Sequence, residues 1–594
     1  MSAAASVHRR SQGVVLGCLV ALLVGACSTL PTSGDVHTRP ASVEESANQA
    51  PYFAPPGPTA GDDPEGIVRG FLLAMQANPP STAVARSFLS ERARAVWRPN
   101  QGTIVYDAVT VDNPGPVGKV SVRLSGAHRL SPQGAWLDGT DGSSTTIPVS
   151  LVRDSGQWRI ENPPDALVVP ASYFSSLFVP FNLYFFDRTG TVLVPSKVYV
   201  PRGDQTATNL VRGLLAGPPP GLRGVAVSAF PSRADLDDLA VVVNDAGIAD
   251  VPLGPTLLEL SPAGLNRVVV ELAWTLRQVP GINRLRLTVD GAPVPLSGGS
   301  TDVSVARGAD YDPVVPAERD LLVLTGGRVV RDDGDQGTAV GGPFGASGYA
   351  LRSIAWDARG HRIAGVAQNG RRVLVAPDRG SRSGDLVRSV FDGGSDLLRP
   401  SYDRFGKLWL VDTPRNARVH LVGGNRSREI EVPGVSGRDV AAFTVTNDGA
   451  RLVAVLAGGT NPVLQVSNIV RDVRGRVLRV RAVRTLQVTG ADLGAPLDVG
   501  QEDTTLVAVL SRPDSGPDRL VFVELDGSTG PVDPQLSPDA PDVVPAGVET
   551  LVASPDPVLA LRGLGRDGSM FTLTDSRRWL RAKVIGVVAA TYAR

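Results

Sequence analysis

Cysteine and lysine are scarce in this chain of 594 residues. The two cysteines, Cys18 and Cys27, both lie near its start, and no cysteine follows them. A disulfide framework and a thiolate metal site are therefore excluded from everything beyond Cys27. Lysine occurs only four times, at Lys119, Lys197, Lys407 and Lys583. Arginine replaces it, and Ala, Gly and Val are in excess, which is typical of a GC-rich genome rather than of a function.

Excess charge of either sign is also absent, because 59 basic residues face 59 acidic ones. This balance gives no electrostatic reason to expect a nucleic acid or an anionic membrane surface as partner. The histidines beyond the first apolar run are far apart in sequence: His37, His128, His361 and His420. No G-x-S-x-G or Walker-type loop occurs. Unless folding joins distant residues, we expect no catalytic residues, no metal site and no cofactor, and thus no enzyme.

Long apolar runs are missing too, with one exception at the start of the chain. Gly13 to Ala26 is a continuous apolar stretch of 14 residues, preceded by the basic pair Arg9 and Arg10. A helix that crosses a bilayer needs about 20 residues, so the stretch is short for a permanent span. The arrangement is that of a secretory signal peptide over residues 1–26.

The end of this run, Val24-Gly25-Ala26-Cys27, resembles the bacterial lipobox. The resemblance implies that Cys27 becomes the N-terminus and carries an N-palmitoyl group and an S-diacylglycerol group. An ordinary cleaved signal with a chance cysteine is the alternative. Residues 27–62 are rich in Pro, Ser and Thr without an apolar period, which predicts a flexible tether. We expect a protein that lipid anchors to the extracytoplasmic face of the cell membrane.

The first folded region is predicted over residues 63–164. Ile67, Phe71 and Met75 share one face of a helix, and a second helix is expected from Ser81, its N-cap, to about Trp97. Strand-like runs follow, the last two separated by a turn at 154–156. This order predicts an α+β fold, and it resembles nuclear transport factor 2-like domains, which are cones with an apolar pocket.

The second folded region is predicted over residues 180–296. Its clearest helix begins with Ser261 as N-cap and Pro262 in the first turn, and Trp274 is expected in the core. A hairpin is expected around residues 244–247. The phrases "LLAGPP", "AWTL" and "LTVDG" resemble the GerMN domain of sporulation and germination proteins. That resemblance carries no catalytic motif and implies a binding or scaffolding module.

The third folded region, residues 315–594, contains a loose repeat. Turns with Gly360, Gly406, Gly449 and Asp503 precede apolar strands at spacings of 46, 43 and 54 residues. A period near 40–50 made of strands and turns is typical of a β-propeller, here with about six blades and with five or seven as alternatives. We predict that its first strand, residues 321–324, closes the ring by pairing with the last strands. The fold class is thus multidomain, α+β followed by all-β.

Two patterns in this region have competing interpretations. "GLGRDG", Gly563 to Gly568, fits a dinucleotide-binding loop, but a strand-like run follows it where a helix is needed, so a hairpin turn is favoured. Asp357, Asp403 and Asp448 recur at one place in the repeat. They are candidates for a ring of carboxylates such as propeller glycosidases use, or they are simply turn residues.

The order of lipobox, tether, GerMN-like region and propeller resembles the LpqB family of actinobacterial lipoproteins. The resemblance implies that the protein binds the extracytoplasmic domain of a membrane sensor histidine kinase. It also implies modulation of two-component signalling linked to the cell wall and division.

Two alternatives remain open at this point. A propeller-based envelope glycan hydrolase or cell-wall-binding protein predicts acids and arginines gathered at the propeller mouth, with a cell-wall polymer as partner. A solute-binding lipoprotein predicts two lobes around a cleft, which a three-part chain ending in a propeller does not favour.

Overall fold

The computed structural model describes residues 52–594, apart from 113–116, 138–141, 238–239, 297, 315–317, 335–336, 414–415, 425, 489–492 and 529–541. The expected signal peptide and Cys27 lie outside the described residues. Residues 52–62, which the sequence assigns to the tether, lie against the first folded region. Phe53 and Asn78 exchange backbone hydrogen bonds of 2.9 Å there.

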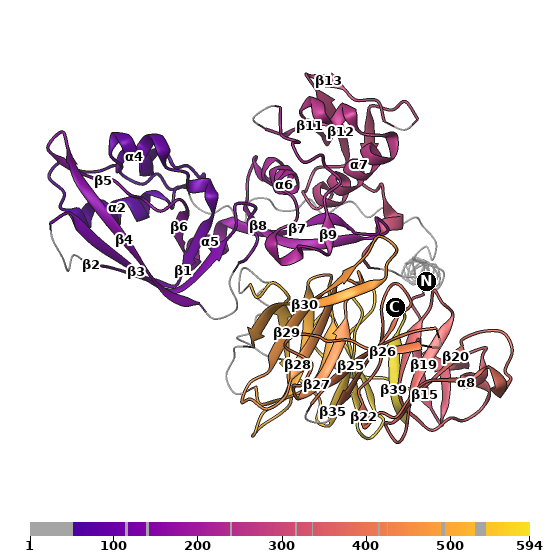
Figure 1. Ribbon diagram of the computed structural model, residues 1–594. Helices are drawn as coiled ribbons and strands as arrows, with labels where there is room; N and C mark the ends of the chain where they lie inside the picture. The colour runs from indigo at the N-terminus through magenta and orange to yellow at the C-terminus, as the bar shows by residue number, and fades with distance from the viewer. Residues whose placement is uncertain are drawn as a thin grey trace, which may run out of the picture. The chain divides into compact units, whose positions relative to one another are not determined.

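The first region has short helices followed by a six-stranded sheet of order β5-β4-β3-β1-β6, with β2 also paired to β3 (Figure 1). Only β1 and β6 run parallel. Its elements are α2 (Pro64–Ala74), α3 (Ala83–Ser87), α4 (Glu91–Val96), η1 (Pro99–Gln101), β1 (Thr103–Tyr106), β2 (Ala108–Asp112), β3 (Lys119–Leu130), β4 (Ser143–Asp154), β5 (Gln157–Ile160), β6 (Leu167–Pro170) and α5 (Ala171–Leu177). The predicted α+β architecture is confirmed.

The second helix of this region differs from the sequence-based expectation. Instead of one helix from Ser81 to Trp97, the chain forms α3 and α4 with a break at residues 88–90. Ser90 caps α4, because its hydroxyl accepts a hydrogen bond from Ala93 N at 3.2 Å. Phe88 and Leu89 are almost fully buried. A bridge to Ile160 at the break therefore replaces helical hydrogen bonds.

The second region contains two sheets and two main helices. One sheet has the order β8-β7-β9, and the other has the order β10-β11-β12-β13 with β14 paired to β12. Its elements are β7 (Phe178–Asp187), β8 (Leu193–Pro201), α6 (Thr206–Leu215), η2 (Pro220–Leu222), β9 (Ala226–Val227), β10 (Val242–Val243), β11 (Ile248–Pro252), η3 (Pro255–Glu259), α7 (Pro262–Leu276), β12 (Arg284–Val289), β13 (Ala292–Pro293), β14 (Asp302–Ser304) and η4 (Ala309–Tyr311).

Helix α7 organises the core of this region. Ser261 caps it as predicted, accepting a hydrogen bond from Gly264 N at 3.2 Å. Residues 268–276 are all buried, because one side of the helix faces the core of α6, β11 and β12 and the other faces a small aromatic cluster. Trp274 lies in that cluster and donates from Nε1 to Gly308 O at 3.0 Å, so the prediction that it is a core residue is confirmed.

The third region is a β-propeller. Six antiparallel sheets follow one another in the described residues, and we number them blades 1 to 6 in that order. Blade 1 contains β15 (Leu321–Thr325), β16 (Arg328–Arg331) and β17 (Thr338–Ala339), followed by α8 (Pro343–Ala346). Blade 2 contains β18 (Leu351–Asp357), β19 (Arg362–Ala367), β20 (Arg372–Pro377) and, after η5 (Gly384–Leu386), β21 (Arg388–Asp392). Blade 3 contains β22 (Asp396–Leu397), β23 (Ser401–Tyr402), β24 (Leu408–Thr413), β25 (Arg418–Gly423) and β26 (Arg426–Glu429).

The remaining blades repeat the four-stranded pattern. Blade 4 contains β27 (Val440–Val445), β28 (Arg451–Leu456), β29 (Val463–Arg471) and β30 (Val477–Gln487). Blade 5 contains β31 (Ala495–Gln501), β32 (Leu506–Arg512), β33 (Arg519–Glu524) and β34 (Asp542–Val543). Blade 6 contains β35 (Val548–Val552), β36 (Arg562–Gly565), β37 (Met570–Leu573) and β38 (Trp579–Arg581). The prediction of about six blades is confirmed.

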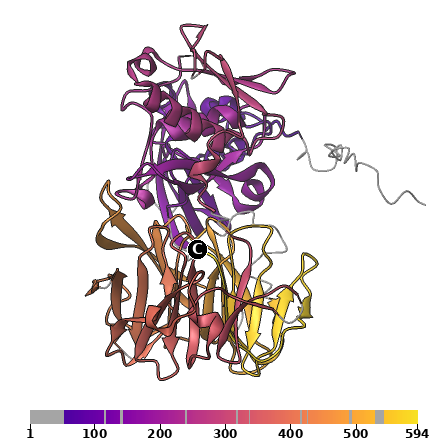
Figure 2. The same cartoon turned by 90° about the vertical axis from the view of Figure 1, so that its right-hand side faces the viewer.

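The ring closes as the sequence analysis predicts. The last strand, β39 (Val587–Tyr592), pairs antiparallel with the first, β15, and thereby completes blade 1 (Figure 1). The inner strands contact one another in the order β39, β18, β23, β27, β31, β35 and back to β39. Figure 2 shows the C-terminus near the middle of the propeller rather than at its rim.

The described chain from Tyr52 to Arg594 forms one compact unit. The apolar core of the second region includes Ala450 and Val470 of blade 4, so this region and the propeller share buried contacts. None of the helices in the described part of the chain is both long and apolar enough to cross a membrane.

Candidate functional site

The three repeated aspartates lie in turns between an inner strand of a blade and the next strand. Asp357 accepts a hydrogen bond from Gly360 N at 2.8 Å and pairs with Arg362. Asp448 accepts one from Ala450 N at 2.9 Å. Their carboxylates therefore fix the turns that the repeat needs.

Asp403 has the largest set of hydrogen-bond and ion-pair partners of the three. Its carboxylate accepts hydrogen bonds from the backbone of Phe405 and Lys407, each at 2.9 Å, and from Trp409 Nε1 at 2.8 Å. It also pairs with the buried Arg471 at 2.7 Å. The interpretation of these aspartates as turn residues is confirmed.

Two arginines, Arg399 and Arg594, lie among the inner strands of the propeller. Arg399 donates to Leu551 O at 2.6 Å and pairs with the buried Asp498 at 3.0 Å. Arg594 donates to Thr444 Oγ1 at 2.7 Å, and its backbone N donates to Trp356 O. Burial, and then the charge of Arg399, lowers the pKa of Arg594 to about 10. The cavity left between these residues is only about 30 Å³.

The other sequence patterns have structural roles as well. "GLGRDG" is the β36–β37 hairpin, with Gly568 in the left-handed region at a φ of +77°, so the hairpin interpretation is confirmed. The ring of His128 packs at a tilt against Trp136, and that of His420 against Phe391, whereas His37 lies outside the described residues. No group of three or more His, Cys, Asp or Glu side chains that could hold a metal ion is found in the described ranges.

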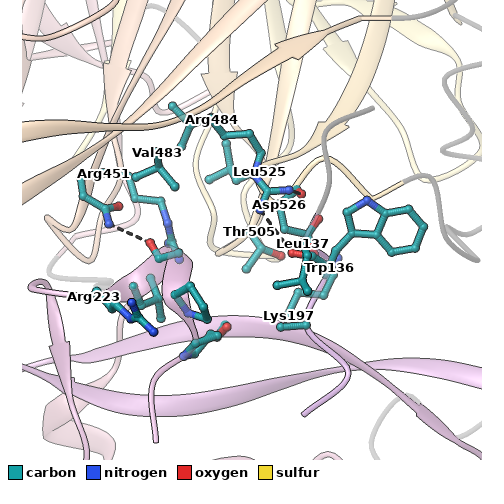
Figure 3. Close-up of a pocket in the computed structure, with 18 of the residues that line it drawn as sticks. Trp136, Leu137, Lys197, Arg223, Arg451, Val483, Arg484, Thr505, Leu525 and Asp526 are labelled. Atoms are coloured by element: carbon teal, nitrogen blue, oxygen red, sulfur yellow. Dashed lines mark hydrogen bonds between the residues drawn. The ribbon is translucent and has the colours of Figure 1, made fainter. Parts of the chain in front are cut away.

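The strongest candidate site is a cavity of about 350 Å³ where residues of all three regions meet. We call it the junction cavity. Residues 135–137 come from the first region, residues 196–197 and 219–223 from the second, and the rest of the wall from blades 4 and 5. Figure 3 shows Lys197 and Arg223 on one side and Arg451, Arg484, Thr505 and Asp526 opposite them. The lining has five cationic side chains, Lys197, Arg223, Arg451, Arg481 and Arg484, against one carboxylate, Asp526.

Hydrogen bonds and an ion pair link the regions around this cavity, and we refer to them as ties. Lys197 Nζ pairs with Glu524, and both side chains are nearly buried. Tyr199 and Ser528 share a hydrogen bond of 2.6 Å between their hydroxyls. Burial raises the pKa of Glu524 to about 7, although the charge of Lys197 acts in the opposite direction.

Blade 4 contributes three further ties to the other regions. Arg451 Nη2 donates to Pro195 O at 2.9 Å. Asn468 Nδ2 donates to Gly221 O at 2.8 Å. Arg484 Nη2 donates to Trp136 O at 3.2 Å, and Nη1 donates to Asp526 O. The cations around the cavity thus hold the regions together, while Arg223 and Arg481 remain exposed.

A second cavity, of about 730 Å³, lies between the first region and α6. Met75, Tyr173, Phe178 and Arg212 are part of its wall, and among the residues that the structure describes no carboxylate or imidazole lines it. Tyr199 also lines it, and burial raises the pKa of the Tyr173 and Tyr199 phenols.

The junction residues were not predicted from the sequence. Lys197 and Glu524 are 327 positions apart, and no local pattern marks either one. The only signal is that Lys197 is one of four lysines in an arginine-rich chain.

Comparisons with known proteins cover nearly the whole described chain. Three family models match: the N-terminal domain of lipoprotein LpqB over residues 57–175, a sporulation and spore germination domain over 182–295, and the lipoprotein LpqB β-propeller domain over 327–584. Curated relatives match from end to end. Lipoprotein LpqB of Thermobifida fusca is 27% identical over 97% of this chain and 98% of its own length. The Streptomyces coelicolor protein of the same name is 29% identical over 92% of each chain.

The three matches occur in the order of the three folded regions, and the propeller match lies within the ring that β15 and β39 close. The chain belongs to the LpqB family of lipoproteins.

Proposed function

We propose that the protein is a lipid-anchored, non-enzymatic accessory protein of the cell envelope. It binds the extracytoplasmic part of a membrane sensor histidine kinase and modulates two-component signalling linked to the cell wall and division. The resemblance to the LpqB family supplies this class of partner. Cys27 carries the N-palmitoyl and S-diacylglycerol groups that hold the chain at the extracytoplasmic face of the membrane.

The set of ties around the junction cavity is the observation that carries the proposal. Lys197–Glu524, Arg451–Pro195 and Asn468–Gly221 link the second region to blades 4 and 5. Nearly buried polar links of this kind fix the orientation of the two regions relative to each other. If the regions shifted, each link would break and leave a buried polar group without its partner. Arg484 links the first region to blade 4 through Trp136 O. Three regions held in this way present one composite surface, which suits a binding protein.

The lipid anchor adds to this argument. Two acyl chains give stable attachment where one chain is marginal. A protein tethered to the membrane of its partner meets it at raised effective concentration. A contact of modest affinity is then sufficient for regulation.

The hydrolase alternative lacks its candidate residues. Asp357, Asp403 and Asp448 are bound in turns, and Arg399 and Arg594 lie among the inner strands of the propeller. Binding of a cell-wall polymer stays an outcome of the test below.

Calorimetry tests the proposal directly. A soluble chain starting at residue 28 is titrated into the isolated extracytoplasmic domain of the sensor histidine kinase from the same genome. We expect saturable heat with 1:1 stoichiometry, and none with the kinase's cytoplasmic part as control. Absence of heat at high micromolar concentration would contradict direct binding. Saturable binding to purified wall polymer in its place would establish the alternative.

A further inference from the structure

The outer strand of blade 4 differs from those of the other blades. β30 has 11 residues, whereas the outer strands β17, β21, β26, β34 and β38 have 2, 5, 4, 2 and 3. Within the described residues β30 pairs only with β29, and Figure 1 shows it at the outer edge of its sheet. Edge strands of natural proteins are usually short or covered, because a free edge is a template for another strand.

The charge of this segment has one sign. Between residues 473 and 487 the chain has five arginines and no acid: Arg474, Arg476, Arg479, Arg481 and Arg484. The nearest acid, Asp472, is already paired with Arg476 at 2.7 Å, and Arg484 is used in the ties at the cavity. Arg479 and Arg481 are exposed, and no ion pair with either is found among the described residues.

The two free arginines are presented in register. Arg479 and Arg481 face Val470 and Asn468 in an uninterrupted stretch of antiparallel pairing, so they lie two residues apart on one face of β30. Arg481 also lines the junction cavity. The basic edge therefore continues from the cavity towards the β29–β30 turn.

Exposed apolar side chains accompany the charges. Leu478 is 57% exposed and Val473 is 68% exposed. Arg428 of β26 donates to Val477 O at 2.6 Å, which satisfies one carbonyl near the start of the strand. Beyond that point the free edge offers backbone groups, two arginines and an apolar side chain.

We propose that the free edge of β30 docks an extended acidic segment of a protein partner. The segment adds a strand to blade 4, and its carboxylates, spaced two residues apart, face Arg479 and Arg481. Main-chain hydrogen bonds give such strand addition its affinity, and alternate side chains give it specificity. This inference rests on the proposed function in so far as it names the surface where the sensor docks.

An anionic lipid surface is the competing occupant. It would engage the same arginines but needs neither a free strand edge nor a two-residue spacing. The length of β30 and the unshifted pairing at Arg479 and Arg481 therefore favour a strand, and vesicles become one arm of the test.

The probe is a capped, fluorescently labelled peptide of seven alternating Glu and Val residues, with the Lys/Val peptide as a control for charge. Binding to the soluble chain is measured by anisotropy at low and high salt. The double substitution Arg479→Glu/Arg481→Glu is compared with Arg388→Glu/Arg426→Glu, which makes the same charge change on exposed arginines of β21 and β26.

We expect the Glu/Val peptide to bind and the Lys/Val peptide not to bind. We expect the β30 substitutions to weaken binding by at least about tenfold and the control pair to change it less than about twofold. Hydrogen exchange of β30 amides should slow when the Glu/Val peptide is bound. Absence of peptide binding, binding without slower exchange, or equal losses in both variants would overturn the proposal.

Two further arms separate the possible failures. Binding of phosphatidylglycerol vesicles through Arg479 and Arg481, without peptide binding, would make the edge a lipid patch and overturn strand addition. Undiminished kinase binding by the β30 variant would overturn this docking surface and leave the proposed function standing. Peptide binding with slower exchange, but no kinase binding, would contradict the proposed function and leave the docking edge standing.

Discussion

Glu271 is a fully buried carboxyl group in the middle of α7. Its carboxyl oxygens accept hydrogen bonds from Ala229 N at 3.0 Å, Phe186 N at 3.2 Å and Ser228 Oγ at 3.4 Å. Burial outweighs these bonds and raises its pKa to about 8. Glu271 thus links α7 to β7 and to the segment after β9. Its carboxyl group is mostly protonated at neutral pH.

This raised pKa makes stability depend on pH. The folded state binds the proton more tightly than the unfolded state, so Glu271 favours folding below its unfolded pKa and loses that contribution as pH rises towards about 8. Between about pH 5 and pH 8 we expect a loss of roughly 1 kcal/mol per pH unit from this group. Glu271→Gln should remove it, so that urea midpoints of the variant fall less over this range than those of the parent. Parallel midpoint curves would contradict this account.

Asp403 gives a second prediction at the residue scale. Asp403→Ala leaves Arg471 buried without its carboxylate and frees the turn at residues 403–407, so we expect a loss of about 3–5 kcal/mol in the free energy of unfolding. The control is Asp392→Ala. The side chains of Asp392 and its partner Arg372 are both exposed and lie 3.6 Å apart, so this substitution should lower the free energy of unfolding by less than about 1 kcal/mol. Equal effects of the two substitutions in urea unfolding would show that Asp403 does not hold its turn.

At the scale of elements, closure of the ring depends on β39. Ala590 is 2% exposed and pairs with Val323, whereas Val588 on the same strand is 47% exposed. Ala590→Asp should cost at least about 2 kcal/mol, because it buries a charge between blades. Val588→Asp should stay within about 0.5 kcal/mol. If thermal unfolding shifts equally in both variants, the pairing of β15 with β39 does not stabilise the propeller.

The elements that the sequence predicts correctly are those with local causes. Ser261 and Pro262 start α7 by capping and by a fixed φ, and the Asp567-Gly568 pair makes a turn wherever it stands between strands. The sequence does not predict the break between α3 and α4, because its helical pattern is continuous there. The burial of Phe88 and Leu89 and the bridge from Leu89 to Ile160 override that pattern. The junction cavity was missed because Lys197 and Glu524 meet only after three regions have folded, and one sequence carries no signal for such a contact.

At the scale of the whole molecule, the Lys197–Glu524 tie couples the second region to the propeller. Lys197→Met should leave Glu524 buried without a cation, with Thr505 Oγ1 as its remaining hydrogen-bond donor. At pH 5 Glu524 is protonated with or without Lys197, since burial holds its pKa at about 7 even beside the lysine, so the substitution should cost little. At pH 8 it should lower the melting temperature clearly. Adding Glu524→Gln should restore most of the loss, as measured by calorimetric melting at both pH values. A loss that is independent of pH would contradict a charge tie.

The central claim is that the protein tunes a membrane sensor. The most direct test is the autophosphorylation rate of the sensor histidine kinase in vesicles that receive increasing amounts of the full lipidated chain. We predict a saturable change of roughly fivefold, equivalent to a coupling of about 1 kcal/mol, which disappears when the extracytoplasmic domain of the kinase is deleted. A rate that stays constant up to saturating amounts of the chain would contradict the account.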